Sequence, residues 1–153
     1  MVGTVDYIAP EVFTHDGYTE TVDWWSLGTL MFEMLIGYPP FCGNDMYQTY
    51  LTIANFRKHF EIPDDANISA EAEDLMRKLI NEEENRLGRN GASEIKKHPF
   101  FKGIDWKTIR SQKAPMIPIL KSEIDTRNFE KFEEKEGWHE ESNKDNYKKF
   151  KRR

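Results

Sequence analysis

Residues 22–36 decide the fold class and read Val22-Asp23-Trp24-Trp25-Ser26-Leu27-Gly28-Thr29-Leu30-Met31-Phe32-Glu33-Met34-Leu35-Ile36. Thr21 or Val22 opens a helix, because Asp23 then lies in its first turn, where a carboxylate interacts favourably with the helix dipole. Apolar residues recur at the 3.6-residue period and predict one apolar face made of Leu27, Leu30, Met31, Met34 and Leu35. Gly37 ends this pattern, so the sequence predicts a helix over residues 22–36.

Three further helices are predicted downstream from the same period. Asn44 is the candidate N-cap of a second helix, whose shared side carries Met46, Tyr50 and Ile53. Ser69 caps a third, whose apolar stripe is Ala72, Leu75, Met76, Leu79 and Ile80. A short fourth helix is expected over residues 92–97. No alternating stretch is long enough for a sheet, so the fold class is mainly α.

Composition narrows the class of protein and its surroundings. A chain of 153 residues with 38% hydrophobic content is long enough to bury one core. Its single cysteine, Cys42, excludes an intrachain disulfide, and no signal peptide or apolar run of about 20 residues is present. We therefore expect a cytoplasmic or nuclear protein that does not enter a membrane. A net charge of -5 argues against a nucleic-acid partner.

The sequence changes character after Phe101, where the helical period disappears. Asp105 is expected to cap one turn that carries Trp106 and Ile109. Two prolines, Pro115 and Pro118, then indicate an extended strip lying on a surface. Residues 133–144 contain few apolar side chains, so disorder is expected there. The sequence thus predicts an extended, partly disordered tail.

Several motifs stand in the order of a known family. These are Gly3-Thr4-Val5-Asp6-Tyr7-Ile8-Ala9-Pro10-Glu11, Val22 to Gly28, Gly37 to Phe41, Asn85-Arg86-Leu87-Gly88 and His98-Pro99-Phe100-Phe101. Together they resemble the C-terminal part of a Ser/Thr protein kinase of the AGC group, truncated before Ala-Pro-Glu. The NDR/LATS branch is indicated by Gly37 to Cys42, Phe101 to Trp106, Asp125 to Phe129 and Tyr147 to Phe150. The resemblance implies a partial kinase domain over residues 1–101, a helical C-lobe without the N-lobe, and an AGC-kinase tail over residues 102–153.

The resemblance also implies an activity for the parent family, namely ATP-dependent phosphorylation of protein Ser/Thr with Mg. That reaction needs a Gly-rich loop, a nucleotide-binding Lys, a catalytic loop and Asp-Phe-Gly. None of these motifs occurs in residues 1–153. The four histidines are scattered without metal-ligand spacing: His15, His59, His98 and His139. We therefore expect no catalytic, cofactor-binding or metal residue, and a chain that is catalytically silent alone.

Structural roles for single residues follow from the resemblance. In the resembling family the carboxylate matching Glu11 pairs with the arginine matching Arg86; the alternative is two unrelated surface charges. The carboxylate matching Asp23 fixes the catalytic loop, but here a first-turn helix charge is the favoured interpretation. The segment Gly3, Thr4, Val5 and Tyr7 is expected to be a vestigial substrate segment, with Val5 standing where the family usually has Pro.

Three functional hypotheses stay open. The chain is part of a Ser/Thr kinase, a non-catalytic protein-binding module similar to a pseudokinase scaffold, or a truncated product without a role. As a monomeric module it would bind proteins through its C-lobe helices, with Tyr47 and Tyr50 of the 44–56 helix as docking residues. The MOB-type coactivators of the branch are not expected to bind. Asn146 stands where the branch carries a phosphorylatable Thr, so residues from 133 onward are expected to stay mobile.

Overall fold

The computed structural model describes residues 4–14 and 17–131. Every regular element within these ranges is a helix, which confirms the mainly α fold class. The α-helices are α1 (Val22–Ile36), α2 (Met46–Ala54), α3 (Phe56–His59), α4 (Ala70–Leu79) and α5 (Ala92–Lys96). Short 3-10 helices join them: η1 (Val5–Tyr7), η2 (Pro10–Phe13), η3 (Glu83–Asn85), η4 (Pro99–Phe101) and η5 (Ile109–Ser111).

Helix α1 has the bounds that the sequence predicts. Asp23 lies in its first turn, and Gly37 follows its last residue with φ 101°. This left-handed conformation lets the Gly37 N–H bond the Glu33 carbonyl at 2.8 Å, and it is a conformation that glycine adopts without steric cost. The stop signal read from the sequence is therefore confirmed.

The buried face of α1 differs from the predicted one. Its buried residues are Trp25, Gly28, Thr29, Met31 and Phe32, whereas Leu30, Met34 and Leu35 are 44%, 76% and 44% exposed. Residues two apart on a helix point about 200° away from each other, so burial of Phe32 turns Leu30 outward. The prediction followed aliphatic side chains and was wrong at these three positions, because the aromatic rings and small residues fill the core instead.

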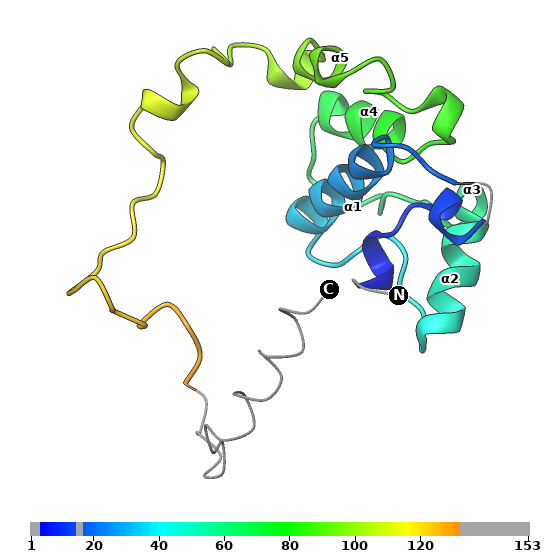
Figure 1. Cartoon of the computed structure of the whole chain (residues 1–153), viewed down its shortest axis with the longest axis horizontal. Coiled ribbons are helices and arrows are strands. Elements are labelled where there is room, and N and C mark those ends of the chain that lie inside the picture. The colour runs from blue at the N-terminus through cyan, green and yellow to red at the C-terminus, as the bar shows by residue number, and fades with distance from the viewer. Residues whose placement is uncertain (1–3, 15–16, 132–153) are drawn as a thin grey trace, which may run out of the picture. The chain divides into compact units, whose positions relative to one another are not determined.

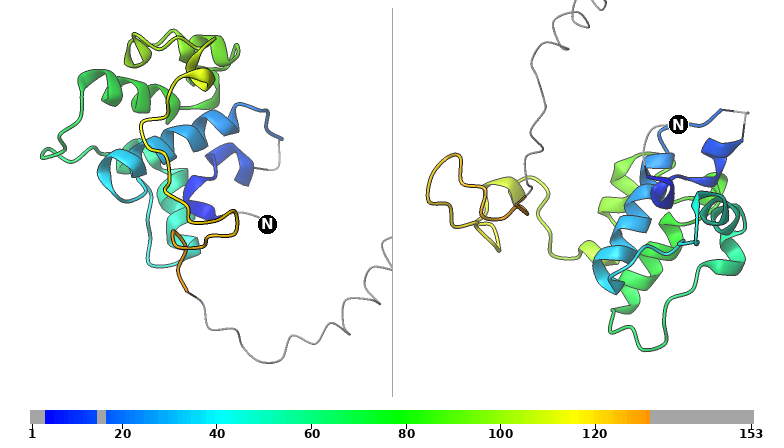
Figure 2. Two further views of the ribbon diagram at one scale, coloured as in Figure 1. Left: turned by 90° about the vertical axis from the view of Figure 1, so that its left-hand side faces the viewer. Right: turned by 90° about the horizontal axis from the view of Figure 1, so that it is seen from below.

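Helices α1 and α4 run side by side and form the centre of the helical unit (Figures 1 and 2). Gly28 permits this close approach. A Cβ atom at Gly28 would lie 2.8 Å from Ile80 Cγ1 and 2.9 Å from Leu79 Cβ, closer than side-chain atoms normally approach. The glycine is therefore needed for its small size, because α4 occupies the space that a side chain would take.

Helices α2, α4 and α5 agree with the sequence except at their ends. Ser69 accepts a hydrogen bond from the Ala72 N–H and caps α4, whose predicted stripe is buried. The cap of α2 is Asp45, which accepts from the Gln48 N–H at 2.8 Å, so the prediction of Asn44 was wrong by one residue. The one-turn helix α3 was not predicted, and α5 is one residue shorter than expected.

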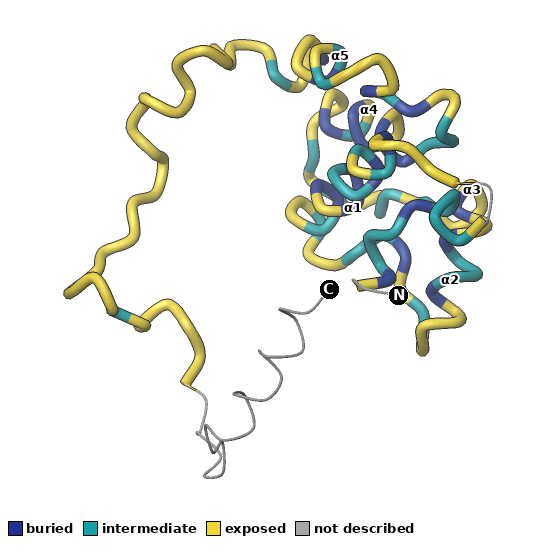
Figure 3. Tube along the Cα trace, viewed as in Figure 1, coloured by how far each residue is buried: buried dark blue, intermediate teal, exposed yellow. Residues whose placement is uncertain are grey.

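Two hydrophobic clusters make up the core, and α1 contributes to both. One joins α1 to the N-terminal segment and contains Val5, Ala9, Trp25, Phe41, Ile53, Phe56 and Ile80. The other joins α1 to α4 and α5 and contains Met31, Phe32, Ala72, Leu75, Met76, Leu79 and Ile95. Segment η1 contacts α1 and α2, and η2 contacts α2, so the first cluster holds the start of the described chain against the helices (Figure 3).

The chain divides into two compact units after Ser111. Residues 102–111 stay with the helical unit because the Trp106 Nε1–H donates to the Lys96 carbonyl and its ring lies 5.0 Å from that of Phe101. The Asp105 carboxylate accepts from the Lys107 N–H and the Thr108 hydroxyl, which forms the predicted turn.

The described part of the second unit, residues 112–131, has no regular element and is exposed along nearly its whole length. Asp125 organises a turn within it, accepting from the N–H groups of Lys121 and Arg127. This lack of regular elements agrees with the predicted tail, and the expectation that the strip lies on a surface stays a prediction. The expectations for residues 133–153, including the Asn146 to Phe150 motif, lie outside the described residues.

Candidate functional site

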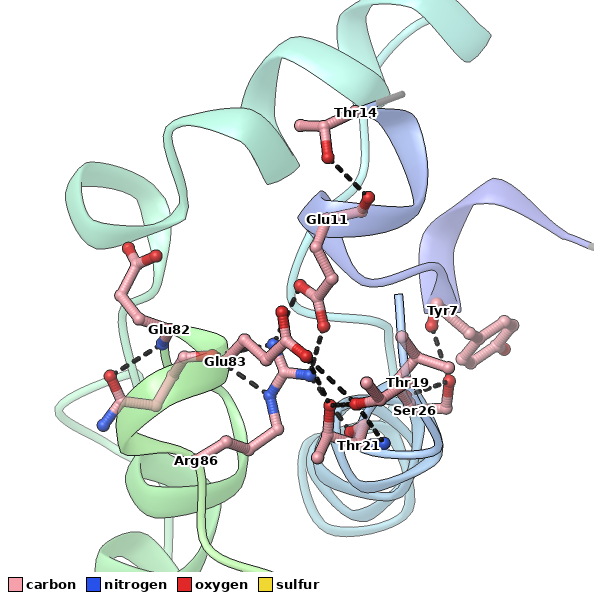
Figure 4. Close-up of polar contacts among 11 residues, drawn as sticks. Tyr7, Glu11, Thr14, Thr19, Thr21, Ser26, Glu82, Glu83 and Arg86 are labelled. Carbon is pink, nitrogen blue, oxygen red and sulfur yellow. Dashed lines mark hydrogen bonds and ion pairs between the residues drawn. The ribbon is translucent and has the colours of Figure 1, made fainter. Parts of the chain in front are cut away.

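The centre of the candidate site is the side chain of Arg86, which follows η3. Its Nη1 and Nη2 donate to the two carboxylate oxygens of Glu11, on η2, at 2.5 and 3.0 Å. Nη1 also donates to the Thr21 carbonyl at 3.0 Å, while Nε and Nη2 donate to the Asn81 carbonyl at 3.1 and 2.9 Å. Figure 4 shows this group. The guanidinium thus makes five hydrogen bonds, as many as it has N–H groups.

Because the Glu11–Arg86 pair is buried, its role is to hold the fold together. The Arg86 side chain is fully buried, the Glu11 side chain is 13% exposed, and the guanidinium carbon lies 5.3 Å from the centre of the Trp25 ring. A buried charge is tolerated only when it is paired and hydrogen-bonded, and both conditions hold here. The predicted contact between Glu11 and Arg86 is present, and the alternative of two unrelated surface charges does not apply.

Two threonine hydroxyl groups lie beside the Glu11–Arg86 pair. The hydroxyls of Thr19 and Thr21 lie 2.8 Å apart, and both donate to the Glu83 carboxylate, at 3.0 and 3.3 Å (Figure 4). Thr21 therefore serves the site twice, through its hydroxyl and through the carbonyl that Arg86 binds. These bonds connect the turn before α1 to η3.

The N-terminal segment is held on α1 by Tyr7. The Ser26 hydroxyl donates to the Tyr7 carbonyl at 2.8 Å (Figure 4). The Tyr7 hydroxyl donates to Glu33 Oε2 at 2.6 Å. The hydrogen bond to Glu33, together with partial burial and the charge of that carboxylate, raises the pKa of Tyr7 above its usual 10.0. The phenol therefore stays protonated and remains a donor to Glu33.

The other residues of the predicted substrate segment have different surroundings. Thr4 is exposed and precedes η1, Val5 is buried, and Gly3 lies outside the described residues. Asp23 is exposed in the first turn of α1, the position of a favourable helix charge. Val5 and Tyr7 thus lie in the same segment as Glu11, which Arg86 binds, whereas Thr4 and Asp23 are exposed.

An apolar pocket of about 340 Å³ opens beside this segment. Its lining comes from η1, η2 and α2, namely Val5, Phe13, Met46, Tyr47 and Tyr50. The rings of Phe13 and Tyr50 meet edge to face at 4.9 Å. Sequence reasoning named Tyr47 and Tyr50 of the 44–56 helix as docking residues but missed Phe13, because only the fold brings η2 beside α2.

Residues 1–101 match the family model described as protein kinase domain. The chain belongs to the protein kinase domain family. Within that domain the site holds the Ala9-Pro10-Glu11 segment in place, through Glu11 and Arg86 at one end and Tyr7 at the other.

Similar kinases place the domain in the NDR/LATS-like branch of the AGC group. The chain is 59% identical over 129 residues to the serine/threonine-protein kinase CBK1 of Debaryomyces hansenii, covering 84% of this chain and 18% of that protein. It is 57% identical over 129 residues to CBK1 of Saccharomyces cerevisiae, covering 84% and 17%. The serine/threonine-protein kinase cot-1 of Neurospora crassa is 54% identical over 128 residues, with 84% and 21% covered. The chain thus spans about a fifth of the length of these relatives.

Kinase family membership implies ATP and Mg for a complete kinase. The residues of this chain do not fit either group. Its sequence contains no Gly-rich phosphate loop and no Asp-Phe-Gly, and residues 4–14 and 17–131 contain no cluster of three His, Cys, Asp or Glu side chains able to hold a metal. Within the same described ranges, no helix is both long and apolar enough to cross a membrane.

Sequence reasoning found the ion pair but missed most of its support. The carbonyls of Thr21 and Asn81 carry no sequence signal, because any residue supplies a carbonyl. The Ser26 and Glu33 contacts had a usable signal, since both are polar residues inside an otherwise apolar helix. Trp25 is fully buried, and its Nε1 is a buried side-chain nitrogen without a hydrogen-bond partner among the described residues.

Proposed function

We propose that this chain is the substrate-side portion of an NDR/LATS-like Ser/Thr protein kinase and acts as a protein-binding surface without transferring phosphate by itself. The complete kinase would phosphorylate protein Ser/Thr with ATP and Mg. The observation that carries the proposal is the Ala9-Pro10-Glu11 segment, held by the Glu11–Arg86 pair in a chain without nucleotide-binding motifs. Phosphoryl transfer depends on positioning and charge stabilisation by those motifs, so their absence removes the chemistry.

Protein partners fit the exposed side chains better than other partners. The pocket beside α2 is apolar, and the net charge of -5 repels polyanions such as nucleic acids and anionic lipid surfaces. We propose a monomer, located in the cytoplasm or the nucleus, that binds proteins through its C-lobe helices. The alternative of a truncated product without a role predicts poor accumulation in cells, which immunoblotting during a block of protein synthesis measures.

Two assays of the purified 153-residue chain test the proposal of catalytic silence. Isothermal titration calorimetry with ATP and Mg should give no heat of binding, and a basic peptide incubated with labelled ATP should acquire no phosphate. A complete NDR/LATS-like kinase, assayed alongside, controls for peptide and buffer. Micromolar ATP binding by the chain would overturn the proposal. Sequencing the transcript upstream of Met1 then shows whether Asp-Phe-Gly is encoded in frame.

A further inference from the structure

The apolar pocket beside α2 has an open rim and a fixed floor. Val5 forms its buried part, whereas Met46 and Tyr47 are 70% and 64% exposed. The edge-to-face contact between Phe13 and Tyr50 holds two lining rings in a defined geometry. Its volume of about 340 Å³ is at the lower end of the range of about 300–1,000 Å³ for preformed ligand pockets. A hollow of this size accepts one large apolar side chain rather than an extended ligand.

The part of the sequence that supplies the pocket lining carries charge of one sign. Residues 1–56 contain no Lys or Arg but seven carboxylates: Asp6, Glu11, Asp16, Glu20, Asp23, Glu33 and Asp45. Residues 57–153 hold the other 20 of the 27 acidic residues and all 22 Lys and Arg, which leaves that part with a net charge of +2. The acidic excess therefore comes entirely from the segment that builds η1, η2, α1 and α2.

Two carboxylates flank the pocket in the chain. Asp6 follows the lining residue Val5, and Asp45 precedes Met46 and is exposed. Glu11 is excluded from this role because Arg86 occupies both of its oxygens. The first cation of the sequence, Arg57, lies 2.9 Å from Glu82. The pocket thus has an apolar lining, and two of its lining residues, Val5 and Met46, have a carboxylate as their neighbour in the chain.

From this combination we propose that the pocket formed by Val5, Phe13, Met46, Tyr47 and Tyr50 docks a protein segment that carries one large apolar side chain flanked by Lys or Arg. The apolar side chain enters the hollow, and the flanking cations lie near Asp6 and Asp45. The inference rests on the proposed function as a protein-binding surface and gives the chemistry of the partner. Polyanions are disfavoured because the same carboxylates repel them.

Fluorescence anisotropy of a labelled peptide tests the proposal with the full 153-residue chain. The probe is GSKRLRKSG, and the two control peptides are GSKRSRKSG, without the apolar anchor, and GSEELEESG, with reversed charge. The probe should bind and both controls should bind at least about tenfold more weakly. Binding should also weaken as salt is raised from 50 to 300 mM, because exposed charge pairs are screened.

Variants then locate the binding. Tyr47→Ala should weaken binding about tenfold or more, while Tyr18→Ala, which truncates a tyrosine that is 59% exposed elsewhere, should leave it unchanged. Asp45→Asn keeps an N-cap oxygen for α2 and removes only the charge, so it should weaken binding several-fold and flatten the salt dependence. Circular dichroism verifies folding, and Met46→Ser replaces Tyr47→Ala if the latter does not fold.

The outcomes separate this inference from the proposed function. Three results would each overturn the docking site. They are no probe binding at millimolar chain concentration, equal binding of the serine-substituted peptide, and an unchanged affinity of Tyr47→Ala, or of Met46→Ser where it replaces that variant. None of these results alters the expectation for ATP, which calorimetry measures independently. Conversely, micromolar ATP binding by the chain would overturn catalytic silence and leave the peptide result standing.

Discussion

Glu11 and Arg86 lie 75 residues apart in the sequence and face each other as a two-point ion pair with the guanidinium fully buried. The pair joins η2 to the segment after η3, and the carbonyls of Thr21 and Asn81 use the remaining N–H groups of the arginine. One side chain therefore ties the N-terminal segment to the segment that follows η3. This geometry makes Arg86 a sensitive position for stability.

Replacing Arg86 with alanine should destabilise the helical unit by about 3–5 kcal/mol, because the variant leaves the Glu11 carboxylate and two carbonyls without their donor. Urea unfolding followed by circular dichroism measures the change in free energy. Glu11→Gln, which keeps the shape but not the charge, should cost less than Arg86→Ala. A melting temperature of Arg86→Ala within a degree of the parent would contradict the assigned role.

A matched control comes from an exposed pair on α4. Arg77 donates to Glu73 at 2.8 Å, and both side chains are more than 40% exposed. Such pairs contribute about 0.3–0.5 kcal/mol, so Arg77→Ala should leave the free energy of unfolding nearly unchanged. A loss as large as that of Arg86→Ala would mean that truncation of any arginine, rather than burial of the pair, causes the effect.

Gly28→Ala should destabilise the unit although alanine favours helices. The helix propensity gain is about 1 kcal/mol, whereas inserting a methyl group into a tightly packed core costs about 1–3 kcal/mol. The added Cβ meets Ile80 and Leu79 at 2.8 and 2.9 Å, so repulsion should dominate. Thermal unfolding gives the sign. A raised melting temperature would show that α4 moves aside at little cost.

Much of the fold could be predicted from the sequence, since α1 has its predicted bounds and the α4 stripe is buried as expected. Caps and glycine stops are local signals, which explains this agreement. The buried face of α1 could not be predicted from aliphatic period alone, because tertiary packing selected Trp25 and Phe32 over Leu30 and Met34. The family resemblance, rather than periodicity, supplied the pairing of Glu11 with Arg86.

The pocket shows where sequence reasoning ends. Tyr47 was recognisable as an exposed aromatic residue on a helix, but its neighbours in space come from η1 and η2, more than 30 residues earlier in the chain. The one-signed charge of residues 1–56 can be counted in the sequence, but only the structure shows that Val5 and Met46, the chain neighbours of Asp6 and Asp45, line the same pocket.

Tyr7 should ionise at a higher pH than an exposed tyrosine. Its pKa is raised first by the hydrogen bond to Glu33, and the folded state therefore favours the neutral phenol. The stabilisation is fully present below pH 10.0, the unfolded value, and is lost as pH rises through the folded value. Absorbance at 295 nm measures ionisation, and Tyr7→Phe should remove the part of the titration at the highest pH. If Tyr7→Phe instead removed absorbance change near pH 10.0, where an exposed tyrosine ionises, this prediction would be contradicted.

Asp74 should make the free energy of unfolding depend on pH in the acid range. Its Oδ2 lies 2.6 Å from Lys78 Nζ and 2.9 Å from His98 Nε2. The hydrogen bond to Lys78 is the main cause that lowers the pKa of Asp74 from 3.8. Partial burial acts in the opposite direction, and the contact with His98 lowers the pKa further. The folded state thus favours the charged carboxylate. Its contribution is present above about pH 3.8 and is lost as pH falls through the lower folded value.

The test compares the parent with Asp74→Asn by urea unfolding from pH 7 down to pH 2.5. Their difference in free energy of unfolding should stay constant down to about pH 4 and shrink below it, because protonation removes from the parent the charge that the variant already lacks. Asp64→Asn, at an exposed carboxylate in the loop before α4, should show a much smaller difference throughout. A gap between parent and Asp74→Asn that persists unchanged at pH 2.5 would mean that Asp74 acts through packing with His98 rather than through its charge.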